Sequence, residues 1–130
     1  MSAMPASQRT VQVCLFLIAA IGLMGGTLQM VLGQPETTPR LDNVHRFLAG
    51  IYLGSAFIAL WAAATVRRQD TLILLIALVV FVGGLGRLVS ISQVGLPEPA
   101  GVWLGYLIPE LTLPCIIVIS HLLSRRHAAA

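Results

Sequence analysis

The sequence predicts an all-α integral membrane protein, a single-domain bundle of four transmembrane helices spanning residues 1–130. Hydrophobic residues make up 57% of the chain, charged residues make up 10%, and the mean hydropathy is +0.89. A soluble domain carries about 25% charged residues, and a disordered chain has fewer apolar ones. This composition argues against intrinsic disorder, nucleic-acid binding and a disulfide-rich secreted fold.

Four apolar runs are each long enough to cross a bilayer: residues 11–33, 45–66, 71–92 and 101–123. A hydrocarbon core about 30 Å thick requires roughly 20 helical residues. Helices are expected because lipid offers the backbone no hydrogen-bond partners and the runs lack the alternation of barrel strands. The first run exceeds the roughly 7–15 apolar residues of a signal peptide, and we expect it to remain as the first helix.

Polar residues and prolines mark where these helices begin and bend. Asp42 or Asn43 is expected to cap the second helix, and Asp70 the third, because such side chains accept hydrogen bonds from the first backbone N–H groups. In the fourth run, Pro109 and Pro114 remove two backbone donors, which predicts a kink in that helix.

Arginines set the expected orientation, since all eight basic residues are arginine. Five flank the chain termini and the short turn after the second run: Arg9, Arg67, Arg68, Arg125 and Arg126. Two, Arg40 and Arg46, flank the opposite side. Because basic residues concentrate in cytoplasmic segments, both termini are expected in the cytoplasm, in a multi-pass protein of the bacterial inner membrane.

Small residues line one face of each run. Helices in lipid approach one another most closely where such residues meet, because hydrophobicity gives little drive for association there. The residues expected to pack against a neighbouring helix are Gly22, Gly26, Gly50, Gly54, Gly83 and Gly84.

A polar cavity is expected in the outer half of the bundle. Cβ bonds tilt towards the N-terminus of a helix, so Arg87 on an outward-running helix leans inward and Glu110 on an inward-running helix leans outward. These two side chains are predicted to form a direct or water-bridged ion pair, with Arg46 capping the same cavity. The expected cavity residues are Gln29, Asn43, Arg46, Arg87, Tyr106 and Glu110.

The charges of this cavity suggest a ligand. An ionised side chain at the centre of a membrane helix costs about 2.5–3.5 kcal/mol, so such residues usually mark a functional site. Two arginines against one glutamate leave a positive excess, which favours an anionic group such as a carboxylate or a lipid phosphate. An ion pair that only fixes the register of the helices is an equally weighted alternative.

Catalytic and metal-binding patterns are not visible in the sequence. No nucleophile–base arrangement or phosphate-binding loop appears, so neither an enzyme nor a bound cofactor is expected. His45 and His121 lie at opposite membrane faces in the expected topology, and together they cannot bind one metal ion.

Two stretches carry a family resemblance. One is Asn-Val-His-Arg-Phe-Leu-Ala-Gly-Ile-Tyr-Leu-Gly at residues 43–54, and the other is Gly-Gly-Leu-Gly-Arg-Leu-Val-Ser at residues 83–90, followed by Gly95, Pro97 and a glutamate in the fourth run. Both resemble a family of small four-helix bacterial membrane proteins, domain of unknown function 4345, over roughly residues 11–123. The resemblance implies signature positions at Asn43, Arg46, Gly50, Arg87 and Glu110, and it implies no established activity.

Three functions are hypotheses at this point. The leading one is a non-enzymatic accessory or scaffolding subunit of a membrane complex, bound to other membrane subunits or to a second copy within the lipid bilayer, with no nucleic acid. The second is a binder or carrier of a small amphipathic anion or anionic lipid in the outer-half cavity. The third is the membrane subunit of a quinone-linked oxidoreductase, which the more distant likeness to DoxX-like four-helix proteins implies and which needs a partner to hold the cofactor.

Overall fold

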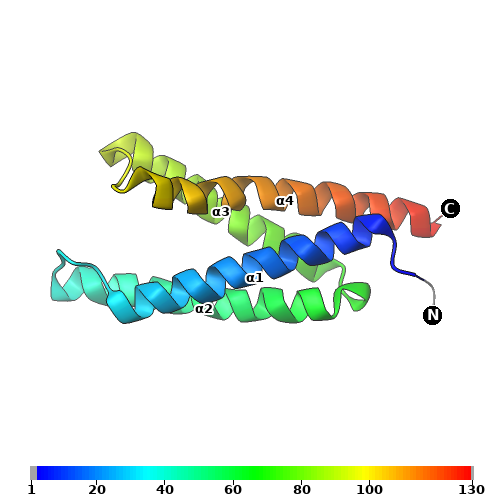
Figure 1. Cartoon of the computed structure of the whole chain (residues 1–130), viewed down its shortest axis with the longest axis horizontal. Coiled ribbons are helices and arrows are strands. Elements are labelled where there is room, and N and C mark those ends of the chain that lie inside the picture. The colour runs from blue at the N-terminus through cyan, green and yellow to red at the C-terminus, as the bar shows by residue number, and fades with distance from the viewer. Residues whose placement is uncertain (1–2, 130) are drawn as a thin grey trace.

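The computed structural model describes residues 3–129, and these form an all-helical bundle without strands (Figure 1). The elements are α1 (Ala6–Leu32), α2 (Pro39–Ala64), the 3₁₀ turn η1 (Val66–Arg68), α3 (Thr71–Val94) and α4 (Ala100–Ala129). All four α-helices are long and apolar enough to cross a membrane. The predicted all-α fold with four membrane-spanning helices is therefore confirmed at the level of length and composition.

The start of α2 differs from the sequence-based expectation. The helix begins at Pro39, because Thr38 occupies the N-cap and its Oγ1 accepts a hydrogen bond from the Leu41 N–H (3.3 Å). Asp42 therefore lies in the first turn of the helix and is not its cap. This shift of about one and a half turns moves every side chain near the start of α2 to a different position relative to its neighbours.

Two other helix ends also differ from the predicted runs: α1 begins at Ala6 instead of residue 11, and α4 ends at Ala129 instead of residue 123. Asp70 occupies the N-cap position of α3, but its carboxylate makes no capping hydrogen bond and its backbone carbonyl accepts from the Ile73 N–H instead (3.1 Å). The fourth helix continues through Pro109 and Pro114 as one unbroken helix.

The helices form two antiparallel hairpins, α1–α2 and α3–α4, which are joined by packing of α1 on α4. The end of the bundle that holds both chain termini and the turn at residues 65–70 is called the termini end, and the end that holds the loops at residues 33–38 and 95–99 is called the loop end. The two hairpins diverge towards the loop end (Figure 1). Although α2 and α3 are consecutive in sequence, they contact each other at few residues, and this weakly packed boundary is the α2–α3 seam.

The apolar core lies in the half of the bundle nearest the termini end. Every helix contributes, and the largest fully buried side chains are Val11, Leu15, Ile73 and Ile117. Alanines at positions 59, 62 and 63 of α2 complete the core and let α1 pack closely on this helix. Cys14 is buried in the same core, and neither it nor Cys115 forms a disulfide.

Three of the glycines expected at helix contacts do lie at close contacts. A Cβ added at Gly22 would stand 2.7 Å from the Ala56 Cβ, and one at Gly26 would stand 2.9 Å from the Leu53 Cβ. Both positions face α2. Gly84 has the same role between α3 and α4, where an added Cβ would lie 2.8 Å from a side-chain carbon of Leu111.

Of the other three glycines predicted to pack, one makes a loose contact and two make no contact within the bundle. A Cβ at Gly50 would lie 3.3 Å from the flexible Met30 methyl group. At Gly54 and Gly83 no atom lies within 4 Å of an added Cβ, so the prediction that they pack within the bundle is wrong. The reason is that these two glycines lie on helix faces that no other described element covers, Gly54 on α2 and Gly83 on α3.

Candidate functional site

An ion pair between α3 and α4 forms the centre of the candidate site. Arg87 Nε donates a hydrogen bond to Glu110 Oε2 at 2.6 Å, which is the direct one of the two arrangements, direct or water-bridged, that the opposite tilts of the side chains predict. Glu110 is 8% exposed and Arg87 is half-buried. Gly84, one turn before Arg87, allows α4 to come close, since a Cβ there would lie only 3.2 Å from the Glu110 Cβ.

Aromatic rings surround the guanidinium of Arg87. Its central carbon lies 5.3 Å from the centroid of the Tyr106 ring and 5.9 Å from that of Trp103, both within the range of cation–π attraction. Trp103, Tyr106 and Glu110 follow one another at spacings of three and four residues, so they share one face of α4. This face of α4 therefore presents a carboxylate and two rings to a single arginine.

Tyr52 of α2 completes the site from across the bundle. A Cβ added at Gly25 of α1 would lie 3.1 Å from Tyr106 Cε1 and 3.3 Å from Tyr52 Cε1, so the two tyrosine rings meet over this glycine. Tyr52 is also within electrostatic reach of both Glu110 and Arg87. All four helices thus contribute to the site, and the absence of a side chain at Gly25 makes room for both rings.

Sequence reasoning missed Tyr52, although a signal for it exists. Buried alanines follow α2 at positions 49, 56, 59 and 63, and Tyr52 falls in phase with them at helical spacing. A tyrosine within a stripe of small residues has its ring on the packing face and its hydroxyl inside the bundle. The glycines predicted to pack, Gly50 and Gly54, lie on a different face of the same helix.

Several polar atoms of this site have no hydrogen-bond partner within the described residues. They are the hydroxyls of Tyr52 and Tyr106, the Oε1 atom of Glu110 and the two terminal amino groups of Arg87. The side-chain amide of Gln29, one turn beyond Gly25 on α1, makes no protein hydrogen bond either. These atoms are not fully enclosed, since among the described residues only His45 Nε2 is a buried polar side-chain atom without a partner. They reach the surface of the bundle, where a polar group from outside the protein can satisfy them.

Arg46 does not cap this site, contrary to the prediction. Its Nε donates to Asp42 Oδ2 at 2.9 Å, and its guanidinium also donates to the backbone carbonyl of Met30. The cause is the earlier start of α2. Because Asp42 lies inside the helix, four residues before Arg46, the two side chains share one helix face. Arg46 therefore fastens the end of α1 to the start of α2, and it contributes no positive excess near Glu110.

Asn43 also lies outside the site. Its side chain is exposed near the loop end and makes no hydrogen bond to a described residue. Of the six predicted cavity residues, Arg87, Tyr106 and Glu110 are brought together, Gln29 lies on the same face of α1 as Gly25, and Asn43 and Arg46 are elsewhere.

The polar side chains near the termini end differ in being satisfied by the protein. The His121 ring, 7% exposed, has its Nε2 atom 2.7 Å from Asp70 Oδ1, and Arg125 approaches the same oxygen at 3.5 Å. Gln12 Nε2 donates to the Ala63 carbonyl at 3.0 Å. These contacts join α1 to α2 and α4 to the start of α3.

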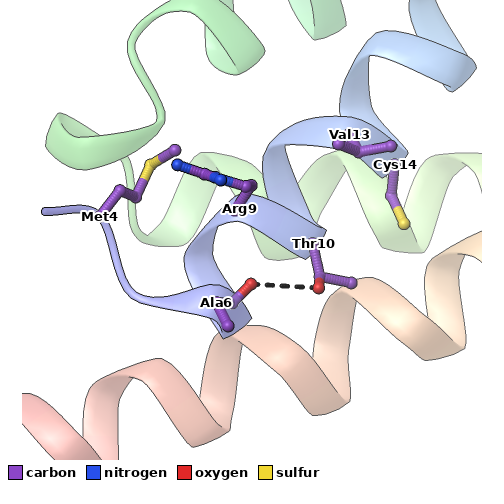
Figure 2. Close-up of a pocket in the computed structure, with 6 residues that line it drawn as sticks. All are labelled: Met4, Ala6, Arg9, Thr10, Val13 and Cys14. Carbon is purple, nitrogen blue, oxygen red and sulfur yellow. Dashed lines mark hydrogen bonds between the residues drawn. The ribbon is translucent and has the colours of Figure 1, made fainter.

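Two surface pockets lie away from the ion pair. The first, about 520 Å³, is at the termini end and is lined by Met4, Ala6, Arg9, Thr10, Val13 and Cys14. Figure 2 shows Met4 and Arg9 projecting to one side of α1, while the Thr10 hydroxyl donates to the Ala6 carbonyl at 3.1 Å. The second pocket, about 500 Å³, lies between α3 and α4 and is almost entirely apolar. Within the described part of the chain, no three His, Cys, Asp or Glu side chains are grouped so that they could hold a metal ion.

Comparison with known families identifies the group to which the chain belongs. Residues 9–121 match the family described as Domain of unknown function (DUF4345). The chain is a member of the DUF4345 family. The predicted resemblance is thereby confirmed, and the matched segment of this DUF4345 protein contains every residue of the candidate site, from Gly25 to Glu110. No curated protein and no solved structure matches the chain.

Proposed function

We propose that this DUF4345 protein binds an amphipathic molecule within the membrane, with the polar head of that molecule against Arg87, Glu110, Tyr52 and Tyr106. One observation supports this proposal above the others: these four side chains gather in one place and still have donors and acceptors without a partner among the described residues. A polar head that supplies the missing acceptors and donors would remove their desolvation cost.

The arrangement of the helices supports access to this site from the lipid. Because α2 and α3 contact each other at few residues and the hairpins diverge towards the loop end, the site has a weakly packed boundary on one side (Figure 1). An apolar tail could lie along the α2–α3 seam while the head reaches Arg87. This geometry favours a ligand that arrives through the bilayer.

We also propose the orientation that the arginines indicate. Five of the eight arginines flank the termini end, so this end would face the cytoplasm of a bacterium, across its inner membrane. The site would then lie in the outer half of the bilayer. Reporter fusions at the C-terminus, one active only in the cytoplasm and one active only outside it, test this placement.

The binding proposal is tested by native mass spectrometry of the protein after gentle extraction from membranes. We expect a bound small molecule on the unaltered protein that is lost from Arg87→Ala and retained by Arg46→Ala. Arg46 is the matched control, because it is a carboxylate-paired arginine in the same half of the bundle but outside the site. Equal retention by Arg87→Ala and the unaltered protein would contradict the proposal.

A second candidate function is that of a subunit in a larger membrane assembly. The observation that favours it is a set of glycines on α3 and α4 with no atom within 4 Å of an added Cβ: Gly83, Gly86, Gly101 and Gly105. Faces of this kind let another helix approach closely in lipid. Leucine at position 83 would block that approach without disturbing the bundle, so Gly83→Leu should lower the stoichiometry seen in native mass spectra. Leu85→Phe, which enlarges an exposed side chain on a different face of α3, should not.

The same spectra bear on the hypothesis of a redox-enzyme subunit. That function would require a cofactor-holding partner to be extracted together with this chain. It stays a prediction that rests on distant resemblance.

A further inference from the structure

We infer that the head group bound at this site is zwitterionic, with a phosphate held by Arg87 and a primary ammonium held by Glu110 and the surrounding rings. The inference rests on the proposed function and specifies its ligand. It corrects the expectation of an anionic ligand, which depended on Arg46 adding a second positive charge.

The charge balance of the site is the first argument. Arg87 and Glu110 form a one-to-one pair, and Arg46 is occupied by Asp42 and by the Met30 carbonyl. An anion alone would add a negative charge beside the buried Glu110 carboxylate, and a cation alone would add a positive charge beside Arg87. A head group with both charges keeps the site neutral, which matters because uncompensated charges are costly in a medium of low dielectric constant.

The open edges of the ion pair give each charge a place. The Nε edge of Arg87 is used by Glu110, while its two terminal amino groups donate to no described residue. That remaining edge is the planar fork that binds phosphate oxygens in a bidentate manner. A phosphate can therefore bind without separating Arg87 from Glu110.

The ammonium position follows from the other side of the pair. Glu110 Oε1 accepts no hydrogen bond from a described residue, and Tyr106, one turn before Glu110 on the same face of α4, has its ring against that of Tyr52 over Gly25. Aromatic faces attract a cation, and the two tyrosine hydroxyls can accept hydrogen bonds from an ammonium. A primary ammonium suits this position better than a quaternary one, because only the former can donate to the carboxylate.

The location of the site selects a lipid as the source of this head group. The site lies within membrane-spanning helices and has its weakest packing at the α2–α3 seam. Phosphatidylethanolamine combines a phosphate, a primary ammonium and apolar tails, and it is the probe that the chemistry indicates.

The experiment offers the purified protein an equimolar mixture of phosphatidylethanolamine, phosphatidylcholine and phosphatidylglycerol in detergent micelles, with retained lipids measured by native mass spectrometry. Charge-assisted hydrogen bonds of this kind predict that phosphatidylethanolamine is retained about tenfold over phosphatidylglycerol. Glu110→Gln should abolish this preference without reducing retention of phosphatidylglycerol. Asp42→Asn, the matched carboxylate control outside the site, should preserve it.

The outcomes separate the inference from the proposed function. If retention depends on Arg87 but the unaltered protein retains phosphatidylglycerol as well as phosphatidylethanolamine, or if Glu110→Gln leaves the preference unchanged, the zwitterion is wrong and the binding site stands. If Arg87→Ala retains all three lipids like the unaltered protein, the proposed function itself is wrong. Tyr52→Phe keeps both charges and removes one hydroxyl, so it tests the site even if the charge variants fail to fold. It should lower phosphatidylethanolamine retention several-fold.

One further arm identifies the source of the head group. Free glycerophosphoethanolamine, a soluble phosphodiester with the same neutral zwitterionic head, is added in excess to the lipid-loaded protein. Failure to displace the lipid supports a membrane lipid as the ligand, and displacement supports the same zwitterion chemistry with a soluble ligand.

Discussion

The two halves of this bundle differ in whether their polar side chains are hydrogen-bonded within the protein. Near the termini end, Gln12, His121 and Ser124 each bond to another part of the protein, and they surround a filled apolar core. In the half nearest the loop end, Tyr52 and Tyr106 have hydroxyls that meet no described partner. The first half satisfies these polar side chains within the protein, and the second leaves two tyrosine hydroxyls open to a partner from outside the described residues.

The two arginine–carboxylate pairs of the loop-end half show the same contrast on a smaller scale. Arg46 and Asp42 lie one turn apart on α2 and are partly exposed. Arg87 and Glu110 come from different helices, and Glu110 is buried. Local geometry alone brings the first pair together, whereas the second pair exists only because α3 and α4 pack.

The largest effect is expected from breaking the buried pair. Glu110→Leu strands a guanidinium that cannot lose its charge, and removal of one partner of a buried pair costs about 3–5 kcal/mol in the free energy of unfolding. Arg87→Leu should cost less, because the stranded carboxyl can take up a proton. The double variant should recover much of the loss, and purely additive costs in a double-mutant cycle would contradict a coupled pair. The control Asp42→Ala should cost under about 1 kcal/mol.

The next effect tests where the core lies. Ile117 is 0% exposed and Ile119 is 61% exposed, although they are two residues apart on α4. Ile117→Ala should lower the free energy of unfolding by about 2–5 kcal/mol, because it leaves a cavity among packed side chains. Ile119→Ala should change it little. Equal losses, measured by unfolding in mixed micelles, would mean that α4 presents a different face to the core.

A smaller effect is expected at the helix-packing glycines. Gly22→Ala places a methyl group 2.7 Å from the Ala56 Cβ and should cost about 1–3 kcal/mol through overpacking. Gly83→Ala meets no atom within 4 Å and should cause no loss. Thermal unfolding of the two variants in the same detergent checks this difference. A stable Gly22→Ala variant would show that α1 and α2 can separate at low cost.

The smallest effect compares two hydroxyls directly. Ser124 Oγ is hydrogen-bonded to Ser7 Oγ at 2.7 Å, so Ser124→Ala should cost about 0.5–1.5 kcal/mol. Tyr52→Phe removes a hydroxyl without a described protein partner and should leave the free energy of unfolding unchanged. Because the two substitutions remove the same chemical group, a matching loss in both would erase the distinction between the halves.

The sequence predicted the helices and the central ion pair because both depend on quantities that a sequence contains. Run length identifies membrane-spanning helices, and the tilt of the Cβ bond together with the chain direction brings Arg87 and Glu110 to the same level. Arg46 was misplaced because the Thr38–Pro39 signal for the start of α2 was not given weight. Gly54 and Gly83 were misplaced because small residues mark a face that can pack but do not identify its neighbour, and α2 and α3 turn out to have little contact.

The packing of α1 on α4 has a consequence for the order in which the protein is made. Val11 and Leu15 of α1 share their core with Ile117 of α4, so α1 completes its contacts only when α4, which follows it in the chain, has been made. Chains are made from the N-terminus, and elements that emerge early wait for later partners. Until α4 enters the bilayer, α1 packs on α2 but lacks the part of its core that Ile117 supplies, and α3 is held mainly by its connection to α2. Insertion of the helices and closure of the core are therefore separate events, and the C-terminal helix determines when the second can occur.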